Sequence, residues 1–153
     1  MIRELEKYIS NIITEITANE ELPVYKEEGK RAPKIITGFL PIEEAETTIP
    51  AIAIRTTNGK NDLNEKRTTL KIIIALFFTE SEKGYEKLND LIERISKKII
   101  ETGVILEKYE ILPDIIWEIP EEQPYPFWIG IVNFNVLYGN EYRNDINDWL
   151  DGK

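Results

Sequence analysis

Carboxylates are the only chemically capable side chains that this sequence has in quantity, because it contains 28 Asp and Glu residues but no histidine and no cysteine. The absence of histidine removes the commonest general base and the commonest transition-metal ligand. The absence of cysteine removes thiolate nucleophiles, thiolate metal sites and disulfides. Any acid–base or metal chemistry would therefore depend on carboxylates.

Two close pairs of carboxylates are candidates for such chemistry. Glu121 and Glu122 are adjacent, and neighbouring side chains of an extended chain point to opposite sides, so they make no acid–base pair. Asp145 and Asp148 are three residues apart and would share one face of a helix, but two carboxylates are only half of a metal site. We interpret both pairs as solvated surface groups.

A polar segment, residues 56–66, is rich in oxygen donors of the kind that calcium prefers. The donors are Asn58, Asn61, Asp62 and Asn64. Their register does not match the EF-hand loop, and no closing glutamate lies at the required place. The sequence also lacks the glycine-rich phosphate-binding motifs and the nucleophile motif of serine hydrolases. We predict no catalytic residue, no metal site and no cofactor site, and expect that the protein is not an enzyme.

The net charge of −9 argues against general binding of nucleic acid, which needs a basic surface to neutralise phosphates. It is compatible with DNA that passes near the protein without being bound. The longest unbroken apolar run, Ile72–Phe78, is far shorter than the roughly 20 residues that span a bilayer. The N-terminus has no apolar core of a signal peptide. We expect no membrane partner, and a protein made and used in a reducing cytoplasm or released from one.

Two long helices are predicted by hydrophobic periodicity. In residues 2–16 the apolar residues recur at spacings of three and four, as on one side of an amphipathic helix. A second helix is predicted from Thr79 to about Thr102, with Thr79 and Glu82 at the spacing of a capping box. Gly103 follows where a left-handed cap belongs. The predicted buried face of this helix consists of Tyr85, Leu88, Leu91, Ile92, Ile95 and Ile99.

Runs rich in β-branched residues predict the strands. They are Lys34–Leu40, Ile49–Arg55, Arg67–Phe78, the two ends of Leu106–Trp117, and Phe127–Tyr138. Residues 72–78 are apolar on both faces, which predicts a central strand covered by helices. The last strand alternates apolar residues with asparagines, which predicts one buried and one wet face. Residues 43–48 and 56–66 are predicted loops, and the second of them is expected to protrude.

The order of helix, strands, helix and strands predicts an α+β fold, in which a mainly antiparallel sheet is packed by two main helices. The length of 153 residues fits one domain with a sizeable core, and we assign residues 1–138 to it. Residues 139–153 are predicted to be an acidic C-terminal tail, in which apolar residues could line one side of a short helix.

An aromatic cluster, Tyr125, Phe127 and Trp128, precedes the last predicted strand. Such rings can anchor a partner, since aromatic residues dominate interface energetics, or they can begin a core strand. Trp149 lies in the polar tail, so we interpret it as an anchor within the chain or on a neighbour. The predicted interaction residues are Asn58, Gly59, Lys60, Asn61, Asp62, Leu63, Tyr125, Phe127, Trp128 and Trp149.

Three segments resemble a known family when they are taken in order with the N-terminal helix and the polar loop. They are Ile-Pro-Ala-Ile-Ala-Ile-Arg (49–55), Gly-Tyr-Glu-Lys-Leu-Asn-Asp-Leu-Ile-Glu-Arg-Ile (84–95) and Glu-Gln-Pro-Tyr-Pro-Phe-Trp-Ile-Gly (122–130). This order resembles the small tail-terminator and head–tail joining proteins of long-tailed bacteriophages and their prophages. The resemblance covers about residues 1–138 and lies in the order and texture of the elements.

The resemblance implies a structural virion-assembly protein rather than an enzyme. Such a protein forms a ring, typically a hexamer, that ends the tail tube and presents a surface to the head connector. The implied partners are further copies of the chain, the tail-tube protein and the head-connector protein, with DNA passing through the ring without specific binding. The implied location is the tail–head junction of the virion, and the host cytoplasm during assembly. The alternative is a monomeric acidic binding module, such as an inhibitor or adaptor.

Overall fold

The computed structural model describes residues 2–39 and 45–139. Its helices are α1 (Ile2–Thr17), α2 (Ala45–Thr48) and α3 (Ser81–Thr102). Its strands are β1 (Leu22–Pro23), β2 (Lys30–Arg31), β3 (Lys34–Thr37), β4 (Ala51–Asn61), β5 (Glu65–Phe77), β6 (Val104–Ile105), β7 (Tyr109–Ile111), β8 (Ile116–Glu118) and β9 (Phe127–Gly139). The protein has an α+β fold with a mostly antiparallel sheet, as the sequence predicts.

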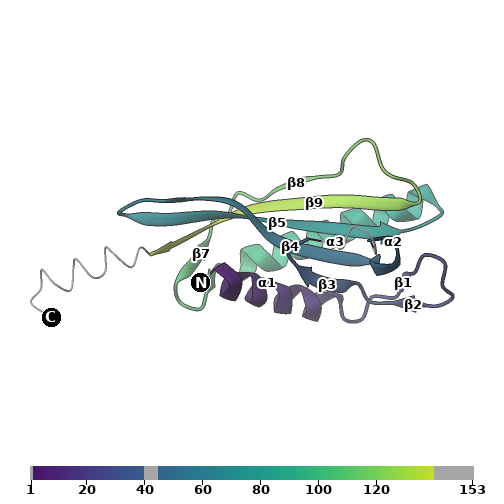
Figure 1. Ribbon diagram of the computed structural model, residues 1–153, viewed down its shortest axis with the longest axis horizontal. Coiled ribbons are helices and arrows are strands. Elements are labelled where there is room, and N and C mark those ends of the chain that lie inside the picture. Colours follow the sequence, from purple (N-terminus) through teal and green to yellow (C-terminus); the bar gives the residue numbers. More distant parts are fainter. Residues whose placement is uncertain (1, 40–44, 140–153) are drawn as a thin grey trace, which may run out of the picture.

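One large sheet runs the length of the molecule, and β5 and β9 form its centre (Figure 1). They pair from Glu65 opposite Gly139 to Phe77 opposite Phe127. The other edge of β5 pairs with β4, and β4 pairs in parallel with β3. The other edge of β9 pairs with β8 at residues 131–133 and with β7 at residues 136–138, and β6 pairs with β7. A separate hairpin, β1–β2, lies beyond the sheet.

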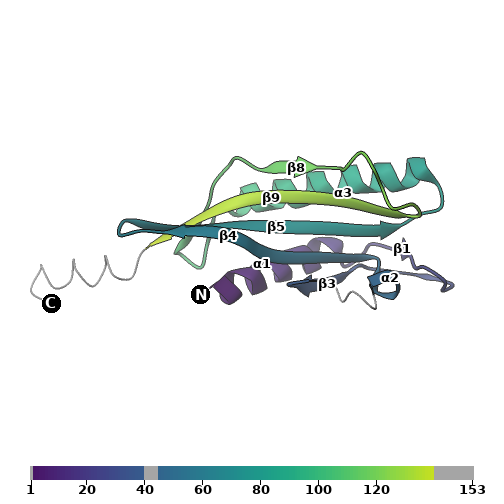
Figure 2. The ribbon, with the colours of Figure 1, turned by 45° about the horizontal axis from the view of Figure 1, so that its top comes forward.

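Both long helices pack on one face of the sheet, which we call the inner face (Figure 2). Gly130 of β9 is directly opposite Ile74 of β5, and an added Cβ atom at Gly130 would lie 3.1 Å from Leu88 of α3. The core comprises Leu5, Ile9 and Ile13 of α1, Leu88, Leu91 and Ile95 of α3, and Ile52, Ile54, Leu70, Ile72, Ile74, Val132, Phe134 and Val136 of the sheet. Burying each such side chain contributes about 1.5–3 kcal/mol. Buried residues alternate with partly exposed ones along β9, which confirms the alternation predicted for the last strand.

The predicted loop Thr56–Lys66 is wrong, because β4 and β5 continue through most of it. Lys60 pairs with Arg67 and Asn61 pairs with Lys66, which leaves residues 62–64 as the turn. Polar side chains mark exposure to water and not the absence of a strand, since backbone groups pair in a ladder whatever the side chains are. The expected protrusion remains, but it is a paired β-hairpin (Figure 1).

The start of α3 differs from the prediction in two ways. Its N-cap residue is Glu80, without a side-chain capping bond, so the capping box of Thr79 and Glu82 does not form. Tyr85 is 56% exposed and Gly84 occupies the buried position instead. Gly103 ends the helix with a φ of +64° and donates its N–H to the carbonyl of Ile99. Its ψ of −66° lies outside the left-handed helical region, so the predicted left-handed cap forms only in part.

Other predictions hold in part or lie outside the described residues. The predicted strand Lys34–Leu40 ends at Thr37 in β3, and part of the predicted loop 43–48 is the short helix α2. Trp149 and the predicted terminal helix lie outside the described residues, and the assignment of residues 1–138 to one domain stays a prediction. Among the residues that the structure describes, no helix is both long and apolar enough to span a membrane.

Candidate interaction surface

The end of the β4–β5 hairpin, residues 57–66, is the arm of the molecule (Figure 1). Asp62 builds its tip: the Asp62 carboxylate accepts the N–H groups of Asn64 and Glu65, each at 2.8 Å. Both hydrogen bonds lower the pKa of the Asp62 carboxyl, and the bond from Glu65 has the larger effect. The predicted interaction residues Asn58, Gly59, Lys60 and Asn61 end β4, while Asp62 and the exposed Leu63 lie in the turn.

Glycine is needed in the arm because the two strands come very close together there. A Cβ atom on Gly59 would lie 2.8 Å from the carbonyl oxygen of Arg67, a distance that real Cβ atoms essentially never show. The register of the strands also shifts between Thr56 and Asn58. An Asn-Gly pair is usual in a tight turn, but here the glycine permits a close approach of two backbones.

A buried carboxylate holds the root of the arm against α1. Glu6 accepts hydrogen bonds from the N–H and the hydroxyl of Thr56, at 3.0 and 3.2 Å, and pairs with Arg3 at 2.9 Å. Only 6% of the Glu6 side chain is exposed. The contact lies beside the register shift of β4, so Glu6 ties the root of the arm to α1.

The face of the sheet that points away from the helices, here called the outer face, carries a line of positive charge. Arg55 lies opposite Lys71, and Lys60 lies opposite Arg67. Directly opposite residues share a face, and these pairs alternate with the inward-facing residues, so all four point outward. Like charges directly opposite one another destabilise a strand pair. None of the four forms an ion pair with a carboxylate of the described residues.

The opposite side of the outer face is acidic. Glu110 of β7 lies opposite Leu137, and Glu118 of β8 lies opposite Ile131. Both carboxylates are exposed, and both point outward because their partners in β9 do. The outer face is therefore divided by charge, with cations on β4 and β5 and carboxylates on β7 and β8, apart from Glu65, which begins β5 next to the turn of the arm.

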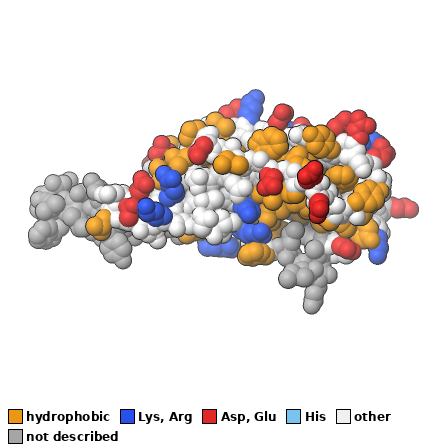
Figure 3. Space-filling model, turned by 90° about the horizontal axis from the view of Figure 1, so that it is seen from above, with side chains coloured by type: hydrophobic (Ala, Val, Ile, Leu, Met, Phe, Trp, Pro, Cys, Tyr) orange, Lys and Arg blue, Asp and Glu red, His pale blue; other side chains and the backbone are white. Residues whose placement is uncertain are grey.

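Between the charged sides, one end of the outer face is apolar. It consists of Ile73, Ala75 and Phe77 of β5, Ile129 and Ile131 of β9, and Ala51 and Ala53 of β4. Of the described helices, the two long ones pack on the inner face, so they cover residues 72–78 from one side. Ala51, Ala53 and Ala75 are nevertheless buried. Figure 3 shows hydrophobic side chains gathered at the end of the molecule opposite the arm. We call this set the apolar end.

The aromatic cluster of the sequence is divided between several environments. Phe127 packs with Tyr25 and Phe77 at centroid distances of 5.2 and 6.0 Å and closes the apolar end. Trp128 lies on the inner face against Gly84, and its indole N–H donates to the carbonyl of Phe78. These two rings hold the fold together.

Tyr125 alone of the three rings is mostly exposed, although its hydroxyl donates to the carbonyl of Thr79 at 2.9 Å. Sequence reasoning missed two exposed apolar residues, Ile116 and Trp117 of β8. Trp117 lines a hollow beside Tyr85 and Trp128. The signal that could have found them is the apolar run Ile115-Ile116-Trp117 between Asp114 and Glu118.

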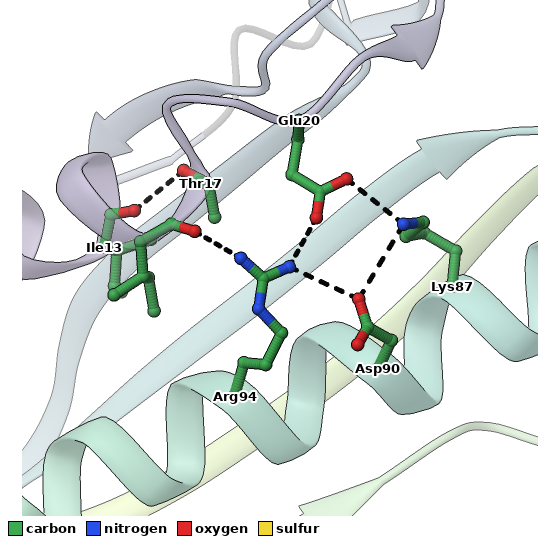
Figure 4. A network of polar contacts seen from close by, with 7 residues as sticks. Ile13, Thr17, Glu20, Lys87, Asp90 and Arg94 are labelled. Carbon is green, nitrogen blue, oxygen red and sulfur yellow. Dashed lines mark hydrogen bonds and ion pairs between the residues drawn. The ribbon is translucent and has the colours of Figure 1, made fainter.

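A charged network joins α1 to α3 and is structural (Figure 4). Glu20 pairs with Arg94 and with Lys87, and Arg94 also donates to the carbonyl of Ile16 and lies 3.3 Å from Asp90. Burial opposes ionisation of Glu20, but hydrogen bonds from Arg94 and Lys87 outweigh it and lower the pKa of the Glu20 carboxyl. Burial also opposes the charge of Arg94, whose pKa is nevertheless raised by its bonds to Glu20 and Asp90.

Within residues 2–39 and 45–139, no three metal-ligating side chains are grouped so that they could hold an ion. The most distinctive surface is therefore the outer face with its arm, a surface suited to protein contacts. The sequence matches no protein-family model and none of the curated proteins.

Proposed function

We propose that the protein is a structural virion-assembly protein that caps a phage tail tube as a ring and joins it to the head connector. The observation that carries this proposal is the charge division of the outer face. A ring is built from head-to-tail contacts, in which each copy offers two different surfaces to its neighbours. The cations of β4 and β5 on one copy complement the carboxylates of β7 and β8 on the next.

The arm supports the same proposal. It extends beyond the body, carries the exposed apolar residue Leu63 at its turn and is anchored at its root by Glu6. An anchored hairpin can hold a contact residue at a fixed distance from a ring. In this proposal the arms meet the tube, the partners are the tube and connector proteins, and DNA passes through the ring without specific binding.

The test mixes the purified protein with the tail-tube protein of the same genome during tube polymerisation. We expect rings on one end of the tubes in negative-stain electron micrographs, and tubes that stop growing once they are capped. Tubes that elongate as they do without the protein would contradict the proposal. Binding to one tube subunit without a ring, at a mass of one copy per partner, would favour the acidic binding module instead.

A charge-reversed variant tests the observation itself. Arg55→Glu with Lys71→Glu places carboxylates where the neighbouring copy also has them, so we expect loss of rings with little change in melting temperature. The matched control is Lys7→Glu with Lys97→Glu, which changes the net charge equally on exposed positions of the helices. Rings that form equally well from both variants would exclude the outer face from the contact.

A further inference from the structure

We infer that the hollow between α3 and β8 binds an arginine or lysine side chain of a different protein. The hollow has a volume of about 350 Å³, within the range of about 300–1,000 Å³ that is usual for ligand sites. The inference goes beyond the proposed function, and it stands whether or not the protein caps a tube.

Three aromatic side chains line the hollow. Tyr85 of α3 and Trp117 of β8 are each more than half exposed. Trp117 lies opposite Val132, which is buried on the inner face, so its indole lies on the side of the sheet where α3 packs. Trp128 is the third ring, and its hydrogen bond to the carbonyl of Phe78 holds it in place. Large exposed rings around a hollow are typical of a contact site.

The segment that follows β8 forms the opposite wall of the hollow and carries the carboxylate of Glu121. Gln123 fixes this wall to β9. Its amide group donates to the carbonyls of Pro120 and Ile129, at 2.7 and 3.0 Å, and its oxygen accepts the N–H of Ile129 at 2.6 Å. A wall held by three hydrogen bonds is preorganised, so a ligand does not have to order it on binding.

The hollow lies in an acidic part of the chain. No lysine or arginine occurs between Lys108 and Arg143, whereas the segment 118–122 contains Glu118, Glu121 and Glu122. All three carboxylates are exposed, and none forms an ion pair with a described residue. Figure 3 shows acidic side chains among the hydrophobic ones at this end of the molecule. Carboxylates without a counter-ion favour a positively charged partner.

Aromatic rings beside a carboxylate also favour a cation, because the face of a ring is negative. The chain forms such contacts elsewhere: Arg55 lies 4.3 Å from the ring centroid of Phe39, and Lys66 lies 5.8 Å from that of Tyr138. No described lysine or arginine lies over the three rings of the hollow. Within the described part of the chain, the place for a cation is therefore open.

The surroundings of the hollow favour a side chain on a protein over a free organic cation. Tyr125 packs on Trp128 with a centroid distance of 6.4 Å and is mostly exposed, and so is Ile116, which precedes Trp117 in β8. A small cation in the hollow would leave both of these side chains uncovered, whereas a polypeptide can cover them. The net charge of −9 gives a basic partner a further attraction.

A pair of short peptides with blocked ends tests the inference. One has an arginine between glycines, and the other has citrulline in its place, which keeps the shape of arginine without its charge. We expect the arginine peptide to shift the indole N–H signals of Trp117 and Trp128 in nitrogen–proton NMR spectra, with saturation. The citrulline peptide should bind about tenfold more weakly, because it retains the apolar contacts but lacks the cation.

Two variants test the hollow itself. Trp117→Leu removes one ring and Glu121→Gln removes the carboxylate, and both positions are exposed, so the fold should tolerate the changes. We expect each variant to bind the arginine peptide about fivefold more weakly. The matched controls are Phe39→Leu, an exposed ring elsewhere, and Glu15→Gln, an exposed carboxyl of α1. Equal losses in variants and controls would overturn the inference.

The other outcomes identify the occupant. Equal affinity for the arginine and citrulline peptides, or no saturable shift, would overturn the inference. Tetramethylammonium that binds as tightly as the arginine peptide would overturn it in favour of a small organic cation. A lower sedimentation mass of the protein when the arginine peptide is added would assign the hollow to a second copy, and would overturn the assignment to a different protein. No tube protein is present, so these results are independent of the capping experiment.

Discussion

At the scale of single residues, the contact with Trp128 explains why position 84 holds a glycine. Three atoms of the indole lie 2.7 Å from the place where a Cβ atom on Gly84 would be. The ring is also held by its hydrogen bond to the carbonyl of Phe78, so it cannot move without loss of that bond. The buried stripe of α3 therefore begins with glycine rather than with Tyr85.

We expect Gly84→Ala to destabilise the protein, contrary to the usual effect in a helix. Replacing a helical glycine by alanine normally gains up to about 1 kcal/mol. Here overpacking against Trp128 costs about 1–3 kcal/mol, which outweighs that gain. Chemical denaturation measures the difference, with Glu86→Ala at an exposed position of the same helix as the control. A more stable Gly84→Ala variant would show that the indole shifts freely.

Glu20 should make the stability of the protein depend on pH in the acidic range. Its pKa is lowered in the folded state from an ordinary value of 4.5, so its stabilising effect is complete above that value and is lost as the pH falls through the lower folded pKa. We expect Glu20→Gln to flatten the fall of melting temperature with decreasing pH. The control is Glu93→Gln, an exposed carboxyl of α3, and an equal effect of both changes would contradict the prediction.

At the scale of elements, regular patterns were predictable and polar strands were not. The alternation of β9 and the apolar stripe of α1 are visible in the sequence because one side of each element is buried. Residues 57–61 of β4 bury neither side, so nothing in their residue pattern distinguishes a paired strand from a loop. The charge division of the outer face was equally hidden, since it depends on register between strands that are distant in the sequence.

Ile95 of α3 is completely buried in the core, at 0% exposure. We expect Ile95→Asp to cost several kcal/mol, because it places an unpaired charge among apolar side chains. Thermal unfolding measures the effect, and the matched control is Ile100→Asp, at a half-exposed position of the same helix. An unchanged melting temperature for Ile95→Asp would show that another face of α3 is buried.

The root of the arm should loosen when Glu6 is replaced by leucine. The N–H of Thr56 would lose its acceptor, and an unsatisfied buried donor costs about 1–3 kcal/mol. We expect amide hydrogen exchange to accelerate around Thr56, with a smaller effect for Glu6→Gln, whose side-chain oxygen can still accept. Equal exchange in both variants would exclude the carboxylate from a role in anchoring the arm.

At the scale of the whole molecule, the two faces of the sheet have different roles. The inner face and the two long helices supply the core, and the outer face carries charges of opposite sign on its two sides. The fold class could be predicted from the order of elements, which composition and periodicity reveal. The side on which the helices pack could not be predicted, because residues 72–78 are apolar on both sides.

The continuous pairing of β5 with β9 has a mechanical consequence. The two strands remain hydrogen-bonded from the turn of the arm to the aromatic contacts at Phe77 and Phe127, a length of about 44 Å at about 3.4 Å per residue. The ladder has no register shift along this length. The arm and the aromatic contacts are therefore coupled through an unbroken series of backbone hydrogen bonds, and a pull on the arm loads this series rather than a single contact.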